Sequence, residues 1–223
     1  MIPLLRRHQL VGLSPTGWAA IQRYSCDIQV QACLAFWAEK GLPLVVTRQH
    51  SGVSKDQIAL GLPAPLQWER RRLAFEVPIN SLLFFGEFPS ATDICPLLPP
   101  ATHSSWLALT DCLDAVGADV RVYGSYGWQS VTGLDYLHPC SDLDLRLLVP
   151  NIAAAHQVVT ALFTASFTSP RLDGELMFPN GNAVAWREWH AWQSGRTDRI
   201  LVKRLRGATL ESGQLWLLEP ILC

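Results

Sequence analysis

Long apolar runs and concentrated positive charge are both scarce in this chain of 223 residues. No stretch of about 18 uninterrupted apolar residues exists, so the sequence predicts no membrane span. Charged residues make up only 17% and the formal net charge is −1. That balance argues against sequence-independent nucleic-acid binding, which needs a strongly positive surface. Basic residues do gather at 70–72 and 203–206, so local contacts with phosphate remain allowed.

Cysteine motifs with metal-binding spacing are absent as well. The six cysteines include no Cys-x-x-Cys pair and no Cys-His pair at metal-binding spacing, which argues against a zinc site. At the start of the chain, charge follows a very short apolar run, the reverse of a secretory signal peptide. We therefore expect a cytoplasmic protein with reduced cysteines.

What the chain does contain is enough apolar sequence, 49%, to form a substantial core. Proline, serine and threonine punctuate residues 88–105, which predicts a domain boundary there. We expect a small N-terminal α/β domain in residues 1–90 and a larger domain in residues 91–223. The elements expected in the first domain are a helix at 17–38, a strand at 42–48, a short element at 55–62 and a strand at 72–77.

The second domain is expected to mix helices and strands in a particular order. The predicted elements are a helix at 104–116, strands at 119–123 and 143–149, a helix at 153–163, a strand at 171–178, a hairpin at 180–182 and a strand at 200–205. This order is typical of a nucleotidyltransferase (polymerase-beta-like) domain with a mixed sheet and flanking helices. The whole chain is therefore predicted to be α+β.

Two aspartates, Asp142 and Asp144, are separated by one residue at an apolar strand. Side chains at positions i and i+2 of a strand point to the same face, while Leu143 and Leu145 point the other way, toward a core. Two carboxylates so close repel each other, so the arrangement favours a divalent cation between them. Oxygen-only ligands suit Mg2+ or Mn2+, which also binds water and substrate phosphates.

Gly124 and Ser125 close the strand that precedes this pair. Glycine lets the backbone turn sharply near a ligand, and the following hydroxyl and amides can donate to phosphate oxygens. Most Gly-Ser pairs are ordinary turns, but this one stands in order before an Asp-x-Asp pair, which favours a catalytic site. Trp128 follows three residues later, where its ring would either border the nucleotide or pack in the core.

A third carboxylate is expected from the strand at 171–178. Asp173 on a neighbouring strand would join the first pair, and Glu175 shares its face and is the alternative. The other interpretation is that Asp173 and Gly174 form a hairpin turn. Lys203 is expected to bind phosphate, because an unpaired ammonium inside an apolar strand would be costly; the alternative is a solvated lysine at a sheet edge.

Several motifs together resemble one family. They are the runs at 123–129 (Tyr-Gly-Ser-Tyr-Gly-Trp-Gln), 132–134 (Thr-Gly-Leu), 141–145 (Ser-Asp-Leu-Asp-Leu), 171–176 and 183–189, with shorter matches at 7–11 and 61–63. The Gly-Ser and Asp-x-Asp elements are common to nucleotidyltransferases. The Tyr-Gly-Trp and Thr-Gly-Leu context narrows the resemblance to malonate decarboxylase holo-acyl-carrier-protein synthase, also called phosphoribosyl-dephospho-CoA transferase.

The resemblance implies a specific reaction. The phosphoribosyl-dephospho-CoA part of 2′-(5″-triphosphoribosyl)-3′-dephospho-CoA would pass to a serine of the apo acyl-carrier subunit of malonate decarboxylase, with release of pyrophosphate. Asp142 and Asp144 would hold a metal, and Asp173 would hold a second metal or take the serine proton. Gly124 and Ser125 would secure the pyrophosphate, helped by Lys203 or a nearby arginine. Sixteen residues separate Ser125 from Asp142, which suggests an extended loop over the site at 126–141. From the residue pattern alone, the segment up to residue 140 is expected to be a loop or a short helix.

Two other functions compete with this one. A nucleotidyltransferase that acts on a small hydroxylated acceptor, such as an aminoglycoside, would carry the same acidic motif. A non-enzymatic module that binds nucleotide or a carrier protein is disfavoured, because a decayed site has no need of a costly cluster of carboxylates.

Overall fold

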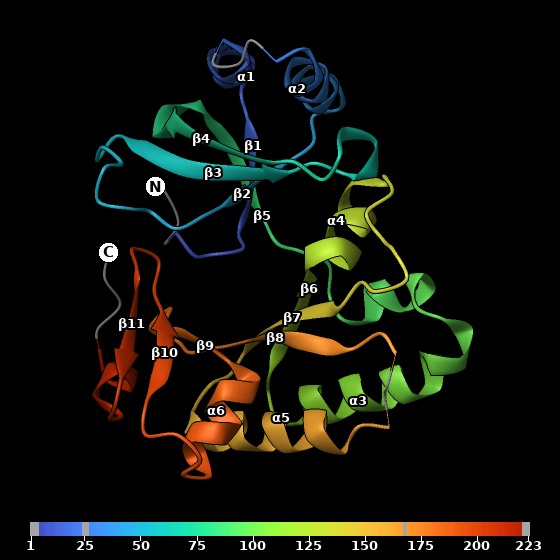
Figure 1. The fold of residues 1–223 in the computed structure, drawn as a ribbon, viewed down its shortest axis with the longest axis vertical. Coiled ribbons are helices and arrows are strands. Elements are labelled where there is room, and N and C mark those ends of the chain that lie inside the picture. Colours follow the sequence, from blue (N-terminus) through green and yellow to red (C-terminus); the bar gives the residue numbers. More distant parts are fainter. Residues whose placement is uncertain (1–4, 24–26, 167–168, 220–223) are drawn as a thin grey trace. The chain divides into compact units, whose positions relative to one another are not determined.

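The computed structural model describes residues 5–23, 27–166 and 169–219. Two compact units make up the chain (Figure 1). Unit 1 contains residues 1–87 together with 134–136 and 205–207, and unit 2 contains residues 88–133, 137–204 and 208–223. Each has its own sheet, so the α+β class that the sequence predicts is confirmed. Among the described residues, no helix is long and apolar enough to cross a membrane.

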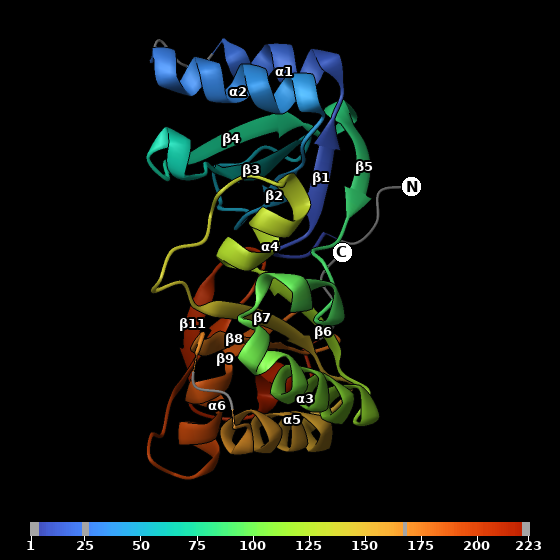
Figure 2. The same cartoon turned by 90° about the vertical axis from the view of Figure 1, so that its right-hand side faces the viewer.

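Unit 1 is built on a five-stranded sheet in the order β4-β3-β2-β1-β5. Its elements are β1 (Leu10–Leu13), α1 (Pro15–Gln22), α2 (Ile28–Lys40), β2 (Leu44–Val46), β3 (Gln57–Pro63), β4 (Arg72–Pro78) and β5 (Leu82–Gly86). The two helices lie side by side on one face of the sheet (Figure 2). Every strand pair is antiparallel, so the unit is of the α+β type and the predicted α/β type is wrong for it.

The single helix predicted at 17–38 is also wrong, because α1 and α2 are separate. Asp27 caps the second helix, and its carboxylate accepts hydrogen bonds from the amides of Gln29 and Val30 at 2.8 and 3.2 Å. The helix ends at Gly41, whose backbone is left-handed. Residues 24–26 of the predicted helix, with Cys26, lie outside the described part of the chain.

Unit 2 is built on a six-stranded mixed sheet in the order β11-β10-β9-β8-β7-β6. Its strands are β6 (Asp119–Tyr123), β7 (Leu143–Leu148), β8 (Leu172–Met177), β9 (Ala183–Ala185), β10 (Ile200–Lys203) and β11 (Ala208–Glu211). Its helices are α3 (His103–Ala115), α4 (Gly124–Thr132), α5 (Ile152–Thr164) and α6 (Trp186–Gln193). Figures 1 and 2 show α3, α5 and α6 on one side of the sheet and α4 on the other.

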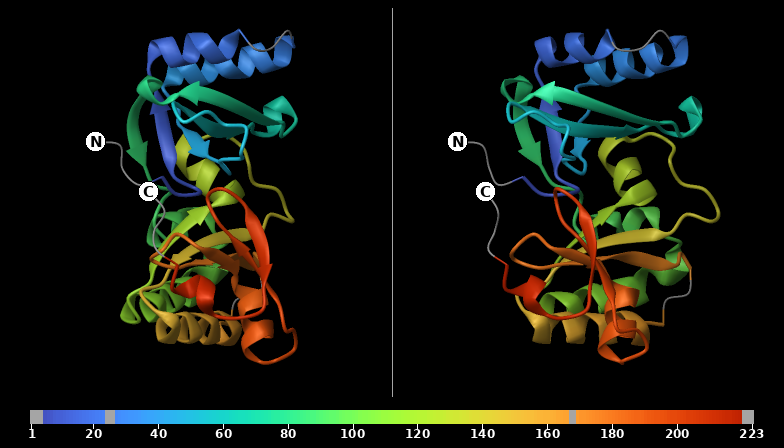
Figure 3. Two further views of the ribbon diagram at one scale, coloured as in Figure 1. Left: turned by 90° about the vertical axis from the view of Figure 1, so that its left-hand side faces the viewer. Right: turned by 60° about the vertical axis from the view of Figure 1, so that its left-hand side comes forward.

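Only β7 and β8 pair in parallel; the other pairs found among the described strands of this sheet are antiparallel. The predicted hairpin at 180–182 connects β8 to β9, and the β10–β11 hairpin forms the far edge of the sheet (Figure 3). Short 3-10 helices lie at Leu66–Trp68, Ile79–Ser81, Thr92–Leu97, Pro100–Thr102 and Leu215–Leu217.

One face of the unit 2 sheet is the apolar core. Leu143, Leu145 and Leu147 of β7 are fully buried there with Trp186 and Trp189 of α6. The helical spacing of these tryptophans in α6 therefore reflects packing in the core. The cysteines at 33, 95, 112 and 140 are free thiols, and Cys223 lies outside the described residues. With one face of the sheet filled by core, the polar face is where the predicted site residues are found.

Candidate active site

Strand pairing places two of the predicted aspartates side by side. β7 and β8 run parallel, and Asp144 lies directly opposite Asp173 in their register. Asp142 lies directly before β7, close enough for its negative charge to raise the pKa of Asp144. The predicted strand through Asp173 is confirmed, and the alternative of a hairpin turn at Asp173 and Gly174 is wrong, since both residues lie inside β8. Three carboxyl groups therefore share one end of the polar face.

The carboxyl group of Asp144 is strongly perturbed by this setting. Burial raises its pKa to about 7, and the negative charges of Asp173 and Asp142 raise it in the same direction. The positive charge of Arg171 opposes that shift in part. A carboxylate disfavoured by burial and by like charges gains most from a bound cation.

Gly124 touches Asp144 so closely that no side chain fits there. Its φ angle is +61°, and a Cβ atom at this position would lie 1.8 Å from Oδ2 of Asp144. Both facts restrict the position to glycine. The sharp turn that the sequence predicts at this glycine therefore brings the backbone against the carboxylates of Asp142, Asp144 and Asp173, which we call the carboxylate set.

Residues 124–132 form a helix, so the extended loop predicted at 126–141 is wrong for its first half, and the alternative of a short helix is confirmed there. The first amides of α4 lack partners within the helix, and the positive end of the helix dipole favours an anion there. Ser125 stands at this end, half-buried, and no hydrogen bond of its hydroxyl to another described residue is found. Gly127 lets α4 sit tightly on β6, because a Cβ there would lie 2.2 Å from the carbonyl oxygen of Val122.

Arg171 belongs to the same cluster, although the sequence reasoning gave it no role. Its Nε donates to Oδ1 of Asp142 at 3.0 Å, and its Nη2 donates to Oδ2. The same Nη2 lies 3.7 Å from Oδ2 of Asp173. These hydrogen bonds hold the pKa of Asp142 below its ordinary value, and the charge of Arg187 acts in the same direction. The position of Arg171 directly before β8, opposite the Asp-x-Asp pair, is the signal that could have identified it.

Glu175 and Lys203 form a separate ion pair on the same face. Nζ of Lys203 donates to Oε1 of Glu175 at 2.7 Å, and the Glu175 side chain is only 5% exposed. The pair explains how a lysine is tolerated inside β10, because the buried carboxylate compensates its charge. Contact of Lys203 with phosphate stays a prediction.

Trp128 lies in the interior of unit 2. Its side chain is 4% exposed, and its ring packs edge-on against Phe88 with the centroids 5.3 Å apart. This arrangement corresponds to the core alternative for the residue. A contact between Trp128 and a nucleotide stays a prediction that this geometry does not favour.

The carboxylate set offers the ligand type that Mg2+ or Mn2+ prefers, since all its donor atoms are carboxylate oxygens. Among the described residues, no three His, Cys, Asp or Glu side chains are already arranged as ligands around one point. Asp142 shows why, because both of its oxygens face Arg171. The residues fit a divalent cation by type and by shared face, and Asp142 would have to exchange partners to bind one.

Comparison with known proteins covers both units. A family model described as phosphoribosyl-dephospho-CoA transferase MdcG, C-terminal domain, matches residues 90–214, and the corresponding N-terminal domain model matches residues 6–86. The chain belongs to the phosphoribosyl-dephospho-CoA transferase family. The family resemblance that the sequence motifs predict is thereby confirmed.

Individual relatives of the same name extend over most of the chain. A phosphoribosyl-dephospho-CoA transferase of Xanthomonas campestris pv. campestris (strain 8004) is 35% identical over 205 residues, covering 92% of each chain. One from Bradyrhizobium diazoefficiens is 34% identical over 211 residues, covering 92% of this chain and 88% of its own. No solved structure was found to match the chain. The family is therefore shown, whereas the polymerase-beta-like fold stays a prediction.

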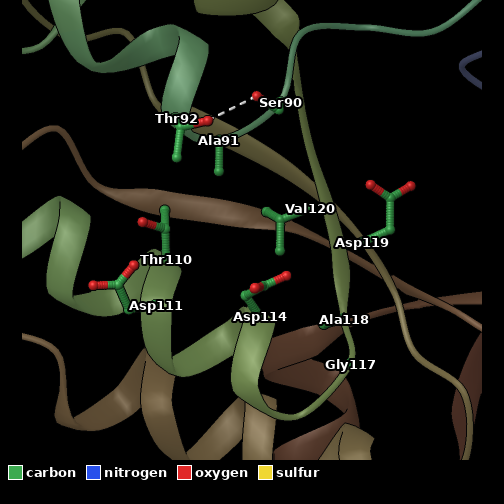
Figure 4. A pocket seen from close by; sticks show the side chains of 10 residues that line it. All are labelled: Ser90, Ala91, Thr92, Thr110, Asp111, Asp114, Gly117, Ala118, Asp119 and Val120. Atoms are coloured by element: carbon green, nitrogen blue, oxygen red, sulfur yellow. Dashed lines mark hydrogen bonds between the residues drawn. The ribbon is translucent and has the colours of Figure 1, made fainter.

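A hollow in unit 2 lies away from the carboxylates of this transferase. Its volume is about 460 Å³, and it lies between α3 and β6 (Figure 4). Asp111, Asp114 and Asp119 line it, but Asp111 and Asp119 lie on opposite sides of the hollow. Asp119 is also paired with Arg121 at 2.9 Å. These acids do not converge on a common point, so the hollow is not a competing metal centre.

Proposed function

We propose that this transferase moves the phosphoribosyl-dephospho-CoA group of 2′-(5″-triphosphoribosyl)-3′-dephospho-CoA to a serine of the apo acyl-carrier subunit of malonate decarboxylase. Pyrophosphate is the leaving group. The observation that carries the proposal is the family match over both units, and it is supported by the carboxylate set on the polar face of unit 2.

Asp142, Asp144 and Asp173 are the residues that would hold Mg2+ or Mn2+. When bound, such an ion would offset negative charge on the triphosphate and on the departing pyrophosphate. The raised pKa of Asp144, caused first by burial and then by its acidic neighbours, supports this assignment, because the site disfavours an uncompensated negative charge.

Gly124 and Ser125 are proposed to bind the phosphate end of the donor. The backbone at Gly124 reaches the carboxylate set without a side chain in the way, and the N-terminus of α4 presents amides beside it. The Ser125 hydroxyl adds a donor for a phosphate oxygen. Lys203 would support this end indirectly, since its ion pair reaches across β9 and fixes Glu175 on β8.

Asp173 is proposed to take the proton of the incoming serine. One of its oxygens accepts a hydrogen bond from the Gly174 amide at 2.8 Å, which orients the carboxylate. In the reaction the serine oxygen forms a bond to the α-phosphorus of the donor, and the bond from that phosphorus to the pyrophosphate oxygen breaks. The serine proton passes to Asp173 and the electron pair leaves with pyrophosphate.

Mass spectrometry of the apo carrier subunit tests the function directly. Incubation with the enzyme, Mg2+ and the triphosphoribosyl donor should add one phosphoribosyl-dephospho-CoA group to the carrier, and the Asp144→Asn variant should add none. ATP, GTP, CTP or UTP in place of the donor should give little transfer. Efficient transfer from one of these nucleotides to a small hydroxylated acceptor would instead establish the competing nucleotidyltransferase activity.

A further inference from the structure

Arg171 places a positive charge in direct contact with the carboxylate set. Its guanidinium engages both oxygens of Asp142, through Nε at 3.0 Å and through Nη2. Nη2 is also 3.7 Å from Oδ2 of Asp173. The guanidinium thus links the carboxylate that precedes β7 to the carboxylate inside β8, as a shared cation would.

This pairing is accessible to solvent and can be exchanged. The side chains of Arg171, Asp142 and Asp173 are 62%, 32% and 42% exposed. Exposed ion pairs contribute little to stability, because water screens them and ordering two side chains costs entropy. A divalent cation carries twice the charge on a smaller ion, so it is a stronger competitor for the Asp142 carboxylate than an exposed guanidinium is.

We propose that Arg171 competes with the divalent cation for Asp142, and that it binds the donor's triphosphate once the cation has taken that carboxylate. The inference rests on the proposed function, because it assumes the metal and the phosphate donor named there. A planar guanidinium matches two phosphate oxygens at once, which gives it a second partner of suitable geometry. Arg171 lies directly before β8, where the carboxylates gather, and its exposed side chain has room to turn toward a phosphate.

The exchange would keep charge balanced at each stage. With the guanidinium on Asp142, part of the repulsion among the carboxylates is offset. Once the cation occupies Asp142, the guanidinium is released. It can then bind the phosphates of the donor and offset the negative charge that they add. Arg171 is then a donor-binding residue distinct from Ser125, and its removal should affect cation binding and phosphate binding in opposite directions.

Calorimetric titration with Mn2+ tests this, in the absence and presence of inorganic tripolyphosphate. Arg171→Gln should bind Mn2+ alone about two- to five-fold more tightly than the natural protein, the range set by the strength of an exposed ion pair. With Mn2+ saturating, the same variant should bind tripolyphosphate at least about ten-fold more weakly, because a charged hydrogen-bond donor is lost. Arg171→Lys should retain part of that binding, since it keeps the charge and loses the fork.

Arg121→Gln is the control, because it removes another arginine of unit 2, a half-buried one whose partner is Asp119, at 2.9 Å. Equal tightening of Mn2+ binding in both glutamine variants would reduce the effect to net charge and overturn the proposal. Unchanged Mn2+ and tripolyphosphate binding in Arg171→Gln would also overturn it, while Mn2+ binding that depends on Asp144 would leave the proposed function intact. If no protein binds Mn2+ with or without tripolyphosphate, the metal site and the inference both fail.

Discussion

Glu175 and Asp173 differ in their partners although they share one face of β8. Glu175 is buried and its Oε1 accepts from Lys203 at 2.7 Å, whereas Asp173 lies opposite Asp144. The sequence left these two acids as alternatives for the third carboxylate, because a two-residue step keeps the face. Because Glu175 is already paired with Lys203, Asp173 is the better candidate for the third catalytic carboxylate. Glu175 is expected to stabilise the fold.

The corresponding prediction separates activity from stability. Asp173→Asn should keep its fold and bind the donor but transfer at least about a hundred-fold more slowly, since the proton acceptor is lost. Glu175→Gln should keep most activity and lose about 1–3 kcal/mol of unfolding free energy, because Lys203 loses its charged partner. Carrier modification rates and urea unfolding measure the two quantities. The double variant Glu175→Gln with Lys203→Met should regain stability, because no unpaired charge remains. If Glu175→Gln is instead stable but inactive, Glu175 is the third catalytic carboxylate.

Ser125 carries a second prediction at this scale. Ser125→Ala should cost about 1.5–3 kcal/mol of transition-state stabilisation, or about ten- to a hundred-fold in kcat/KM, if its hydroxyl donates to the leaving phosphate. Steady-state kinetics with the triphosphoribosyl donor measure this. The exposed Ser194 on the far side of unit 2, changed to Ala, is the control. Unaltered kinetics in Ser125→Ala would mean that the serine only begins α4.

Individual residues were predictable where a short repeat decides their direction. The i, i+2 spacing fixes Asp142 and Asp144 on one face, and the apolar residues between them place that face away from the core. Arg171 was not predictable in this way. Its pairing depends on how β7 and β8 align, which is a contact between residues 29 positions apart.

The parallel pairing of β7 and β8 depends on one glycine. Gly174 has φ of +133°, and a Cβ there would lie 1.9 Å from the carbonyl oxygen of Leu145 on the adjacent strand. The sequence analysis predicted a strand through this position, and the structure shows that the glycine allows one strand to approach the other. The element that aligns Asp173 with Asp144 is therefore sensitive to a single methyl group.

Gly174→Ala should destabilise unit 2 by about 3 kcal/mol or more, because the added carbon meets backbone that cannot move independently. Gly133 provides a control in a left-handed position, at φ +69°, with no atom within 4 Å of its added Cβ. Gly133→Ala should cost only about 1–2 kcal/mol, the penalty for the backbone conformation. Urea unfolding compares the two. Similar losses would show that the close approach of β7 and β8 contributes nothing beyond backbone strain.

Elements with clear alternation or clear caps were predictable, and short ones were not. β6 was predicted at its observed bounds and β7 to within one residue. β1 has four residues, all buried, so it offers no alternation by which to recognise it. The separation of α1 from α2 was missed because apolar residues continue across the capping position at Asp27.

At the scale of the whole molecule, the sequence gives the order of elements but not their partners. Residues 134–136 and 205–207 belong by their contacts to unit 1, although they are far from it in sequence. Tyr136 illustrates this, because its hydroxyl donates to the carbonyl oxygen of Pro63 at 2.8 Å. No local pattern encodes such a contact. The antiparallel sheet of unit 1 was likewise not predicted, because β1 and β5, which pair with each other, were not recognised from the sequence.

The stability of the whole molecule should report on Asp144 through pH. The ordinary pKa of this carboxyl is 3.8, and burial, followed by the charges of Asp173 and Asp142, raises it to about 7. The folded protein therefore binds this proton more tightly than the unfolded chain does, so the Asp144 contribution to stability falls as pH rises from about 4 to about 7. The loss amounts to at most about 4 kcal/mol, reduced by solvent screening at a half-buried site.

Asp144→Asn isolates this contribution, because it keeps the shape and removes the titration. Without divalent ions, the Tm of the variant should exceed that of the natural protein by more near pH 8 than near pH 5. Mg2+ should raise the natural protein's Tm more at pH 8 than at pH 5, since the ion binds the ionised carboxylate, and should act weakly on the variant. Scanning calorimetry at both pH values measures all four differences. If the Tm advantage of the variant is the same at both pH values, Asp144 is already ionised at pH 5. Its pKa is then not raised by its acidic neighbours, and the argument that this carboxylate needs a bound cation fails.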